Sequence, residues 1–398
     1  MTKHSKPSPA LTIGVATALI AGVSVGNVGA NVMPTLLDDF TARFSMSESA
    51  AGGVATAQLL TMALTTLLMA RRAARPGRAR MARLGLAVGA LGCLGAAAAQ
   101  EPVTLVLANL VMGAGLGTVY AAAISALSTA GDADRASGVT ILGSALITAL
   151  LLAVVPSAND AWGGGSGFLL LALVCVPAAW LVRRLPDSPG EQPGNAQHYE
   201  NSDRVAPGIL LLLAAGAFAT LSQGAWSYMA KLGREHTHMS ASEVSSILGV
   251  AGIIAIVGAV AGPLAAGRWG RMRSMAVFVV GEALTMYLAL VAESSAVFAV
   301  ATALWQAFLL AILVEVLAAA AVADSSGRWV AALSGAAAVG TGVGPLAVGA
   351  ALDGVGASAL AGLLAVGVLL ASLPLLRMAA AHHTTTQPEP VPDSEPAA

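Results

Sequence analysis

The stretch Ser295–Val322, SAVFAVATALWQAFLLAILVEVLAAAAV, contains a single charged residue, Glu315. A helix of about 20 apolar residues is long enough to cross the roughly 30 Å of hydrocarbon in a bilayer. Alanine and leucine dominate the stretch, and polar and apolar residues do not alternate as they do in the strands of a membrane barrel. The stretch therefore predicts a transmembrane α-helix.

The rest of the chain has the same character. Of its 398 residues, 57% are of apolar types and 10% are charged, and the mean hydropathy is +0.78. Soluble domains average about 45–50% apolar and about 25% charged residues. We therefore expect an all-α integral membrane protein with twelve transmembrane helices. The expected spans are 10–35, 48–70, 81–99, 102–128, 137–157, 163–182, 206–228, 241–266, 274–292, 295–322, 328–351 and 355–377.

The loops between these spans differ in positive charge, which predicts the orientation of the chain. With the N-terminus in the cytoplasm, seventeen Lys and Arg residues fall on the cytoplasmic side and three, Arg43, Lys231 and Arg234, on the outer side. Cytoplasmic loops are enriched in Lys and Arg. We therefore expect a multi-pass protein of the cytoplasmic membrane with both termini in the cytoplasm. The net charge of −1 implies no nucleic-acid partner.

The least apolar internal stretch, RRLPDSPGEQPGNAQHYENSDRVAP, separates six expected spans from six. Its Pro, Gly and charged residues are typical of a flexible linker. We expect an N-terminal bundle over 1–185, a cytoplasmic linker over 186–205 and a C-terminal bundle over 206–378. The Pro-rich, acidic residues 379–398 are expected to form a disordered cytoplasmic tail.

Two short loops share the pattern R-x-G-R-x-R. The first, RPGRAR, covers 75–80 between spans 2 and 3, and the second, RWGRMR, covers 268–273 between spans 8 and 9. They lie 193 residues apart, at the equivalent loop of each half. The repeat predicts two related six-helix bundles.

In these loops and in its span count, the chain resembles the major facilitator superfamily of secondary transporters. That family carries a basic, Gly-containing loop between helices 2 and 3 and a weaker copy between helices 8 and 9, roughly G-x-L-A-D-R-x-G-R-R. The second copy here matches through Gly262-Pro263-Leu264-Ala265 and Arg268-Trp269-Gly270-Arg271, and the first keeps Arg75-Pro76-Gly77-Arg78. The resemblance implies that both loops gate the cytoplasmic face, although Ala74 and Gly267 replace the family's acidic residue. Setting membrane topology is the alternative role of these arginines.

The resemblance also implies that helices 1, 4, 7 and 10 line a substrate cavity at the midplane. The polar and aromatic residues on those spans are the candidates for substrate contact: Asn27, Asn31, Asn109, Tyr120, Gln223, Trp226, Trp305 and Gln306. Hydrogen bonding between helices is the alternative role of the amides. For Trp226 and Tyr228, the alternative is a place in the belt of aromatic residues at the membrane–water interface. The outer-loop residues that follow, Lys231, Arg234, Glu235, His236 and His238, are expected to be solvated.

Two carboxyl groups fall inside expected spans, Glu315 on span 10 and Glu282 on span 9. An unpaired charge at the middle of a membrane helix costs on the order of 3 kcal/mol. Each acid should therefore face a cavity, find a partner or hold a proton. Glu315 is the leading candidate for proton coupling and Glu282 the second, with a structural hydrogen-bonding role as the alternative for both.

These features predict a secondary active transporter, acting as a monomer, that moves a small organic solute by alternating access. Proton-coupled export of a drug-like or hydrophobic compound, that is, an antiporter for efflux, is favoured because the cavity candidates are neutral amides and aromatics. Proton-coupled uptake is the alternative, and a non-transporting sensor of the same fold is the third possibility. We expect no enzyme activity, no cofactor and no metal site, since all six histidines lie outside the spans and no nucleotide-binding loop is present.

Overall fold

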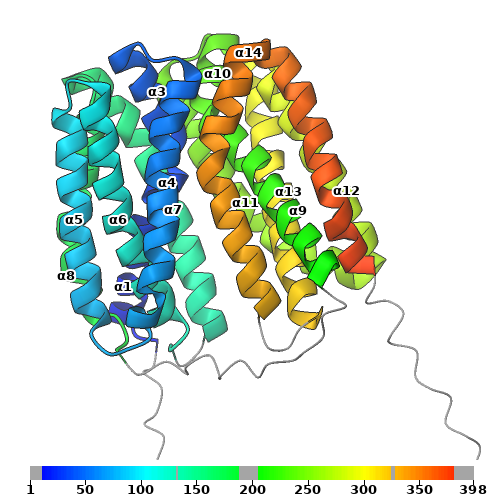
Figure 1. Ribbon diagram of the computed structural model, residues 1–398, viewed down its shortest axis with the longest axis horizontal. Helices are drawn as coiled ribbons and strands as arrows, with labels where there is room; N and C mark the ends of the chain where they lie inside the picture. The colour runs from blue at the N-terminus through cyan, green and yellow to red at the C-terminus, as the bar shows by residue number, and fades with distance from the viewer. Residues whose placement is uncertain (1–10, 131–132, 188–204, 324–327, 381–398) are drawn as a thin grey trace, which may run out of the picture.

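A computed structural model describes residues 11–130, 133–187, 205–323 and 328–380. The described chain consists of fourteen α-helices and one short 3-10 helix, arranged as two six-helix bundles that stand side by side (Figure 1). The first bundle contains α1 Ile13–Gly26, α2 Val28–Asn31, α3 Met33–Phe44, α4 Glu48–Ala73, α5 Arg78–Ala98, α6 Pro102–Leu127, α7 Ala133–Trp162, α8 Ser166–Leu181 and η1 Val182–Arg184. The second contains α9 Val205–Ser227, α10 Met229–Thr237, α11 Ala241–Trp269, α12 Arg271–Leu290, α13 Ser295–Ala323 and α14 Arg328–Ala380.

Ten helices of the described residues are long and apolar enough to cross a membrane. One of them, α14, is two helices joined at Gly356, whose φ of +76° reverses the chain at the top of Figure 1. The segment that begins with the shorter apolar helix α1 supplies one further crossing. The twelve expected crossings are therefore confirmed, and the chain is a multi-pass membrane protein. Most of the linker expected at 186–205 and of the tail expected at 379–398 lies outside the described residues.

The first span differs from the single helix expected over 10–35. The helix breaks at Asn27 and again at Val32, and the chain then continues as α3 to Phe44. Pro34 lies in the first turn of α3, where its missing N–H costs no helical hydrogen bond. The break turns α3 into a separate helix that covers one end of the bundle.

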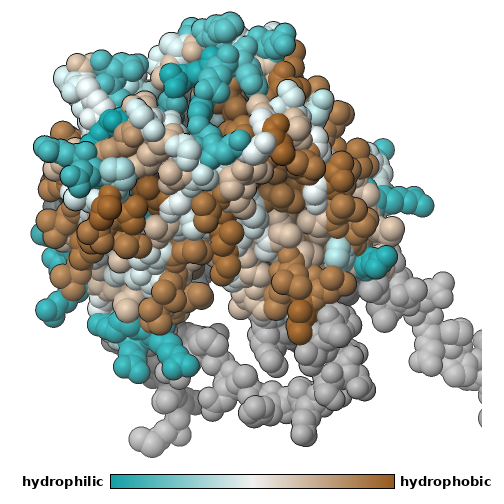
Figure 2. All heavy atoms as spheres, turned by 45° about the horizontal axis from the view of Figure 1, so that its top comes forward, coloured by the Kyte–Doolittle hydropathy of each residue, from teal (hydrophilic) through white to brown (hydrophobic). Residues whose placement is uncertain are grey.

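Apolar side chains form a belt around both bundles. Many large residues, including Leu67, Leu91, Leu173 and Val257, are more than half exposed, as is expected for side chains that face lipid. On the face shown in Figure 2, hydrophobic atoms gather around the middle of the molecule, between hydrophilic atoms toward its two ends. We call the end with α3 and α10 the lock end, and the end with the two R-x-G-R-x-R loops the arginine-rich end.

Small residues bring the helices into close contact inside each bundle. On α6, a side chain at Gly113 or Gly117 would overlap the backbone of α4 at Gln58 or Met62, so this G-x-x-x-G spacing serves packing, as expected. On α14, Gly340 and Gly344 likewise face the backbone of α9.

The 193-residue repeat seen in the two arginine loops extends to the backbone. Ser45 and His238, which are 193 residues apart, both adopt the left-handed conformation that ends α3 and α10, with φ of 49° and 56°. Gly77 and Gly270 are separated by the same interval, and both have positive φ before α5 and α12. The two bundles are therefore built from equivalent segments.

A close contact between α11 and α13 leads to the first prediction. A side chain at Gly258 would overlap the backbone carbonyl of Ala307, whereas nothing lies within 4 Å of the corresponding position at Gly252 on the same helix. We expect Gly258→Ala to destabilise the protein by about 1–3 kcal/mol through overpacking. Thermal unfolding in detergent should give a lower Tm for Gly258→Ala and an unchanged Tm for Gly252→Ala. Equal Tm values for the two variants would contradict the close helix contact.

Candidate functional site

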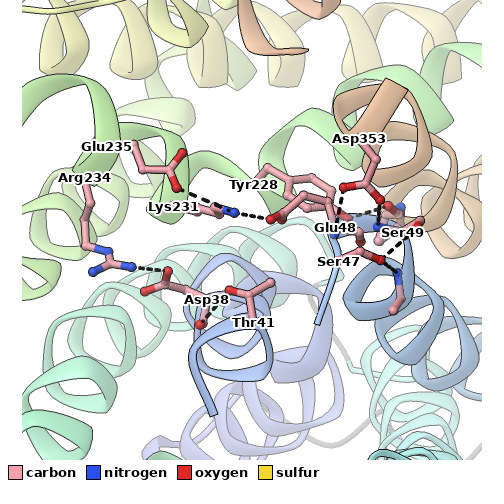
Figure 3. Close-up of polar contacts among 12 residues, drawn as sticks. Asp38, Thr41, Ser47, Glu48, Ser49, Tyr228, Lys231, Arg234, Glu235 and Asp353 are labelled. Atoms are coloured by element: carbon pink, nitrogen blue, oxygen red, sulfur yellow. Dashed lines mark hydrogen bonds and ion pairs between the residues drawn. The ribbon is translucent and has the colours of Figure 1, made fainter. Parts of the chain in front are cut away.

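The two bundles are joined at the lock end by a group of polar contacts that we call the lock. Its residues come from α3 and α4 of the first bundle and from α10, α14 and the α9–α10 junction of the second (Figure 3). The members are Asp38, Glu48, Ser49, Tyr228, Lys231, Arg234 and Asp353. Each contact crosses from one bundle to the other, so the lock holds this end of the molecule closed.

Two ion pairs lie between α10 and the first bundle. The Lys231 ammonium contacts the Glu48 carboxylate, and Nη2 of Arg234 donates to Oδ1 of Asp38 at 2.6 Å. Burial raises the pKa of Asp38 even though the Arg234 charge opposes the shift. Burial alone would lower the pKa of Lys231, but its hydrogen bonds and charge interactions with Glu48 and Glu235 outweigh this effect and raise it. Lys231 therefore keeps its positive charge while the lock is closed.

The N-terminus of α4 is capped from the opposite bundle. The Asp353 carboxylate accepts hydrogen bonds from the backbone N–H groups of Glu48 at 3.1 Å and Ser49 at 2.8 Å. These N–H groups have no partner within the helix, and the helix dipole favours a negative charge at this position. The buried Tyr228 hydroxyl, also from the second bundle, lies 2.8 Å from the Glu48 carbonyl oxygen and 2.9 Å from that of Pro345.

These contacts correct one expectation from the sequence and argue against one alternative. Lys231 and Arg234 do not lie free in solvent, because both form ion pairs between the bundles. Trp226 and Tyr228 are not interfacial belt residues, because both are buried. One signal in the sequence could have revealed the lock. Asp38 and Lys231 lie 193 residues apart, so the repeat places opposite charges at equivalent positions of the two bundles.

Below the lock, the bundles touch along α4 and α14 and along α7 and α11. Side chains at Gly52 and Gly342 would overlap Pro345 and Leu60 of the opposite bundle. The Thr56 hydroxyl accepts a hydrogen bond from the Leu346 N–H at 3.2 Å. All these α4 residues belong to the half of the helix nearer the lock end.

At the arginine-rich end, the first loop is bound to the start of the expected linker. Asp187 Oδ1 accepts hydrogen bonds from the backbone N–H groups of Gly77 at 2.7 Å and Arg78 at 2.9 Å. The Arg78 side chain is fully buried and donates to the carbonyl oxygens of Ala73 and Pro186 and to the Thr129 hydroxyl. Asp187 thus supplies the carboxylate that this loop lacks in its own sequence, and Arg75 remains exposed.

The second loop faces an acid on α13. Glu315 is buried, and both of its carboxylate oxygens lie within 3.0 Å of the Ser274 hydroxyl near the start of α12. Arg271 is close enough to interact with this carboxylate by its charge. Glu315 therefore lies near the arginine-rich end, beside Arg271, in the loop that also contains Arg268 and Gly270.

The amide and aromatic candidates fall into two groups. Asn27, Asn31, Tyr120, Gln223 and Gln306 are partly exposed. Asn109, Trp226 and Trp305 are buried, with exposed fractions of 0%, 7% and 0%. The second group therefore contacts protein in this conformation.

Several of the side-chain amides form hydrogen bonds with neighbouring residues. Nδ2 of Asn27 donates to Asn31, and Nδ2 of Asn31 donates to Thr148 on α7, both at 3.1 Å. Asn109 donates to the Leu105 carbonyl oxygen of its own helix. Gln58 on α4, which the sequence did not single out, is fully buried without a hydrogen-bond partner for its amide.

Glu282 lies within the second bundle. It is fully buried, and Oε1 accepts a hydrogen bond from the Ser222 hydroxyl of α9 at 2.7 Å. The Trp305 indole lies beside the same carboxyl group, outside hydrogen-bond geometry, and makes an edge-to-face contact with Trp226. Within the described ranges, no cluster of three His, Cys, Asp or Glu side chains is suited to a metal ion.

The buried arginine of the first loop leads to the second prediction. We expect Arg78→Gln to lower the Tm, because the Pro186 carbonyl group loses its donor and the Ala73 carbonyl group keeps only that of Ser125, and a buried group left unsatisfied costs about 1–3 kcal/mol. Arg75→Gln is the matched control, and as an exposed substitution it should change stability by no more than about 0.5 kcal/mol. Thermal unfolding in detergent measures both. A Tm for Arg78→Gln as high as that of Arg75→Gln would show that the buried contacts do not stabilise the loop.

Solved structures with the same architecture cover nearly the whole chain. A bacterial homolog of the human lysosomal transporter Spinster, in an inward-facing and unoccupied conformation, has 16% identity and a TM-score of 0.64, covering 92% of this chain and 95% of its own. A mutant of the peptide transporter POT has 13% identity and a TM-score of 0.75, covering 94% and 97%. The nucleoside transporter NupG has 12% identity and a TM-score of 0.68, covering 93% and 99%.

At these identities the structures show a common fold and no common substrate. Among curated proteins, none matches the sequence significantly. A sequence model of the family described as Major Facilitator Superfamily matches residues 16–281, which is more than half of the chain. With its twelve crossings in two bundles, this chain belongs to the major facilitator superfamily and is a secondary transporter, not an enzyme.

Proposed function

We propose that this protein moves a small organic solute across the cytoplasmic membrane by alternating access, with the lock as its outer gate. The observation that carries this proposal is the gathering of inter-bundle ion pairs and helix capping at one end. The bundles are joined there by these polar contacts and by the close packing of α4 on α14, and as two rigid bodies they can separate at that end without unfolding. The closed lock corresponds to a conformation that opens toward the opposite, arginine-rich end.

The distribution of positive charge supports the orientation. The arginines of both R-x-G-R-x-R loops lie at one end, and Arg43, Lys231 and Arg234 lie at the other. Enrichment of Lys and Arg on the cytoplasmic side favours both termini in the cytoplasm and the lock on the outer face. We assign the bundles to residues 1–185 and 206–378, joined by the linker at 186–205, and take a monomer as the working unit.

We infer that the transport is proton-coupled export of a hydrophobic or drug-like compound. The half-buried candidates for substrate contact are neutral amides and a phenol: Asn27, Asn31, Tyr120, Gln223 and Gln306. A carrier of strongly anionic solutes would be expected to hold a cation at midplane, and the arginines of the described spans lie near helix ends. Uptake of a similar solute is the second candidate, and a sensor without transport the third.

The surroundings of the two intramembrane acids change their ranking as proton carriers. Glu315 has Arg271 and Ser274 beside it at the arginine-rich end, which suits a role in the cytoplasmic gate. Glu282 lies eleven residues into the twenty-residue helix α12 and has only neutral neighbours. We therefore propose Glu282 as the coupling acid.

Accumulation of a chemically diverse compound panel in an efflux-deficient bacterial host tests the function. Wild type, Glu282→Gln, Glu315→Gln and empty vector are compared at matched expression, with and without a proton uncoupler. We expect wild type to lower accumulation of some compound, and the uncoupler and Glu282→Gln to abolish the effect. Raised accumulation would favour uptake instead, and no change for any compound would favour the sensor.

A glycine at the lock provides a more direct test of alternating access. A side chain at Gly349 would overlap the Tyr228 hydroxyl and the Glu48 carbonyl group, whereas Gly354 on the same helix has open space around it. We expect Gly349→Ala to oppose closure by about 1–3 kcal/mol, which is about 5- to 150-fold in the gating equilibrium. Thiol labelling of a cysteine placed at Gln223 should become faster from the outside in Gly349→Ala and stay unchanged in Gly354→Ala. An unchanged rate in both would argue against the lock as a gate.

A further inference from the structure

Glu282 occupies an unusual position for a carboxyl group. Its side chain is fully buried on α12, which packs against α11, α13 and α14, and it reaches Ser222 of α9. Oε1 accepts the Ser222 hydrogen bond, and Oε2 has no hydrogen-bond partner. One carboxyl oxygen is thus satisfied and the other remains available for a proton.

The groups that face Glu282 are neutral. They are the Ser222 hydroxyl from α9 and the Trp305 indole from α13, and no charged side chain of the described chain acts on the carboxyl group. A carboxylate buried among neutral groups, without a cation, is far less stable than the protonated acid. In the conformation with the lock closed, Glu282 therefore carries a proton.

The internal repeat shows that the fold itself does not require an acid here. Subtracting the interval of 193 from positions 282, 222 and 305 gives Gly89, Gly29 and Met112 in the first bundle. A glycine and a methionine thus stand at the positions equivalent to Glu282 and Trp305, and both bundles pack six helices. The polar group at Glu282 is therefore an addition to the second bundle.

Helix α9, which carries the hydrogen-bond donor Ser222, ends next to the lock residue Tyr228. Ser222 lies six residues before Tyr228, or about 9 Å along a helix at 1.5 Å per residue. Between them, Trp226 makes its edge-to-face contact with Trp305 at a ring separation of 6.2 Å. A change in the contacts of Glu282 therefore acts on α9 within two turns of the residues that close the lock.

We propose that Glu282 is a proton-binding site that controls the lock through Ser222 and α9. The neutral acid is stable where it is buried, so proton binding favours the closed lock. The carboxylate requires water, so loss of the proton to water favours a conformation in which α9 has moved and the lock is open. By linkage, the state that binds the proton more tightly is favoured at low pH. This inference rests on the proposed alternating-access function.

Spin labels across the lock end test the proposal on the full chain in lipid nanodiscs. The labels are attached to cysteines that replace Ala42 on α3 and Ser358 on α14, in a Cys93→Ala, Cys175→Ala background. We expect the distance to lengthen as pH rises in this otherwise wild-type protein, and to stay short at every pH in Glu282→Gln. Glu315→Gln is the matched control and should keep the full response.

Other titratable groups in and beside the lock are Asp38, Glu48, Lys231 and Asp353, with Glu235 next to Lys231, and a response that came from them would persist in Glu282→Gln. The difference between wild type and Glu282→Gln therefore decides the proposal. An undiminished response in Glu282→Gln overturns it. Ser222→Ala gives a second test. Loss of a hydrogen-bond donor to the carboxylate should move the midpoint of the pH-dependent change in spin-label distance to higher pH. An unmoved midpoint in Ser222→Ala also counts against it.

Infrared difference spectra between low and high pH provide a readout independent of transport. The carbonyl band of a protonated carboxyl group should be lost in Glu282→Gln and retained in Glu315→Gln. If both spectroscopic results hold and no compound is transported, the proton site stands and the proposed function fails. If uncoupler-sensitive transport persists in Glu282→Gln, the function stands and the inference fails.

Discussion

Lipid offers no hydrogen bonds and no counter-charges, so each polar group within a membrane span must find its partner in the protein. This constraint explains the layout of the molecule. Lys231 and Arg234 lie at one end with carboxylates of the opposite bundle, and the arginine loops lie at the other end. Between the ends, small residues let the helices approach until their own backbones are in contact.

The contacts at the lock differ in kind from most contacts within a bundle. Within a bundle, interdigitated helices such as α11 and α13 are held by packing that would be costly to undo. Between the bundles at the lock end, Asp353 and Tyr228 reach backbone groups at or near the start of α4, which water can also satisfy once they are exposed. Under the proposed function, these polar contacts close the lock with defined geometry, and water replaces them when it opens.

Sequence patterns predicted much of the fold, because membrane spans are specified by their own length and composition. The long apolar runs located twelve crossings, and the 193-residue interval between the arginine loops predicted two related bundles. The broken first span was missed, since neither Asn27 nor Val32 is a proline or a glycine and the break depends on local backbone geometry. The candidate site was predicted only in part. Glu315 and Glu282 stood out as acids in apolar runs, but their partners Ser274 and Ser222 lie on other helices, 41 and 60 residues away.

The sequence by itself determined that this chain spans a membrane, where its helices run and where its positive charges gather, because each of these properties depends on residues close together in the chain. Only the tertiary structure decided which charges meet. Arg234 and Asp38, 196 residues apart, form a pair because two bundles dock at one end. It also distinguished Glu282, among neutral groups, from Glu315, beside Arg271. The surroundings of a buried acid are set by the helices that pack against it, and no local pattern records them.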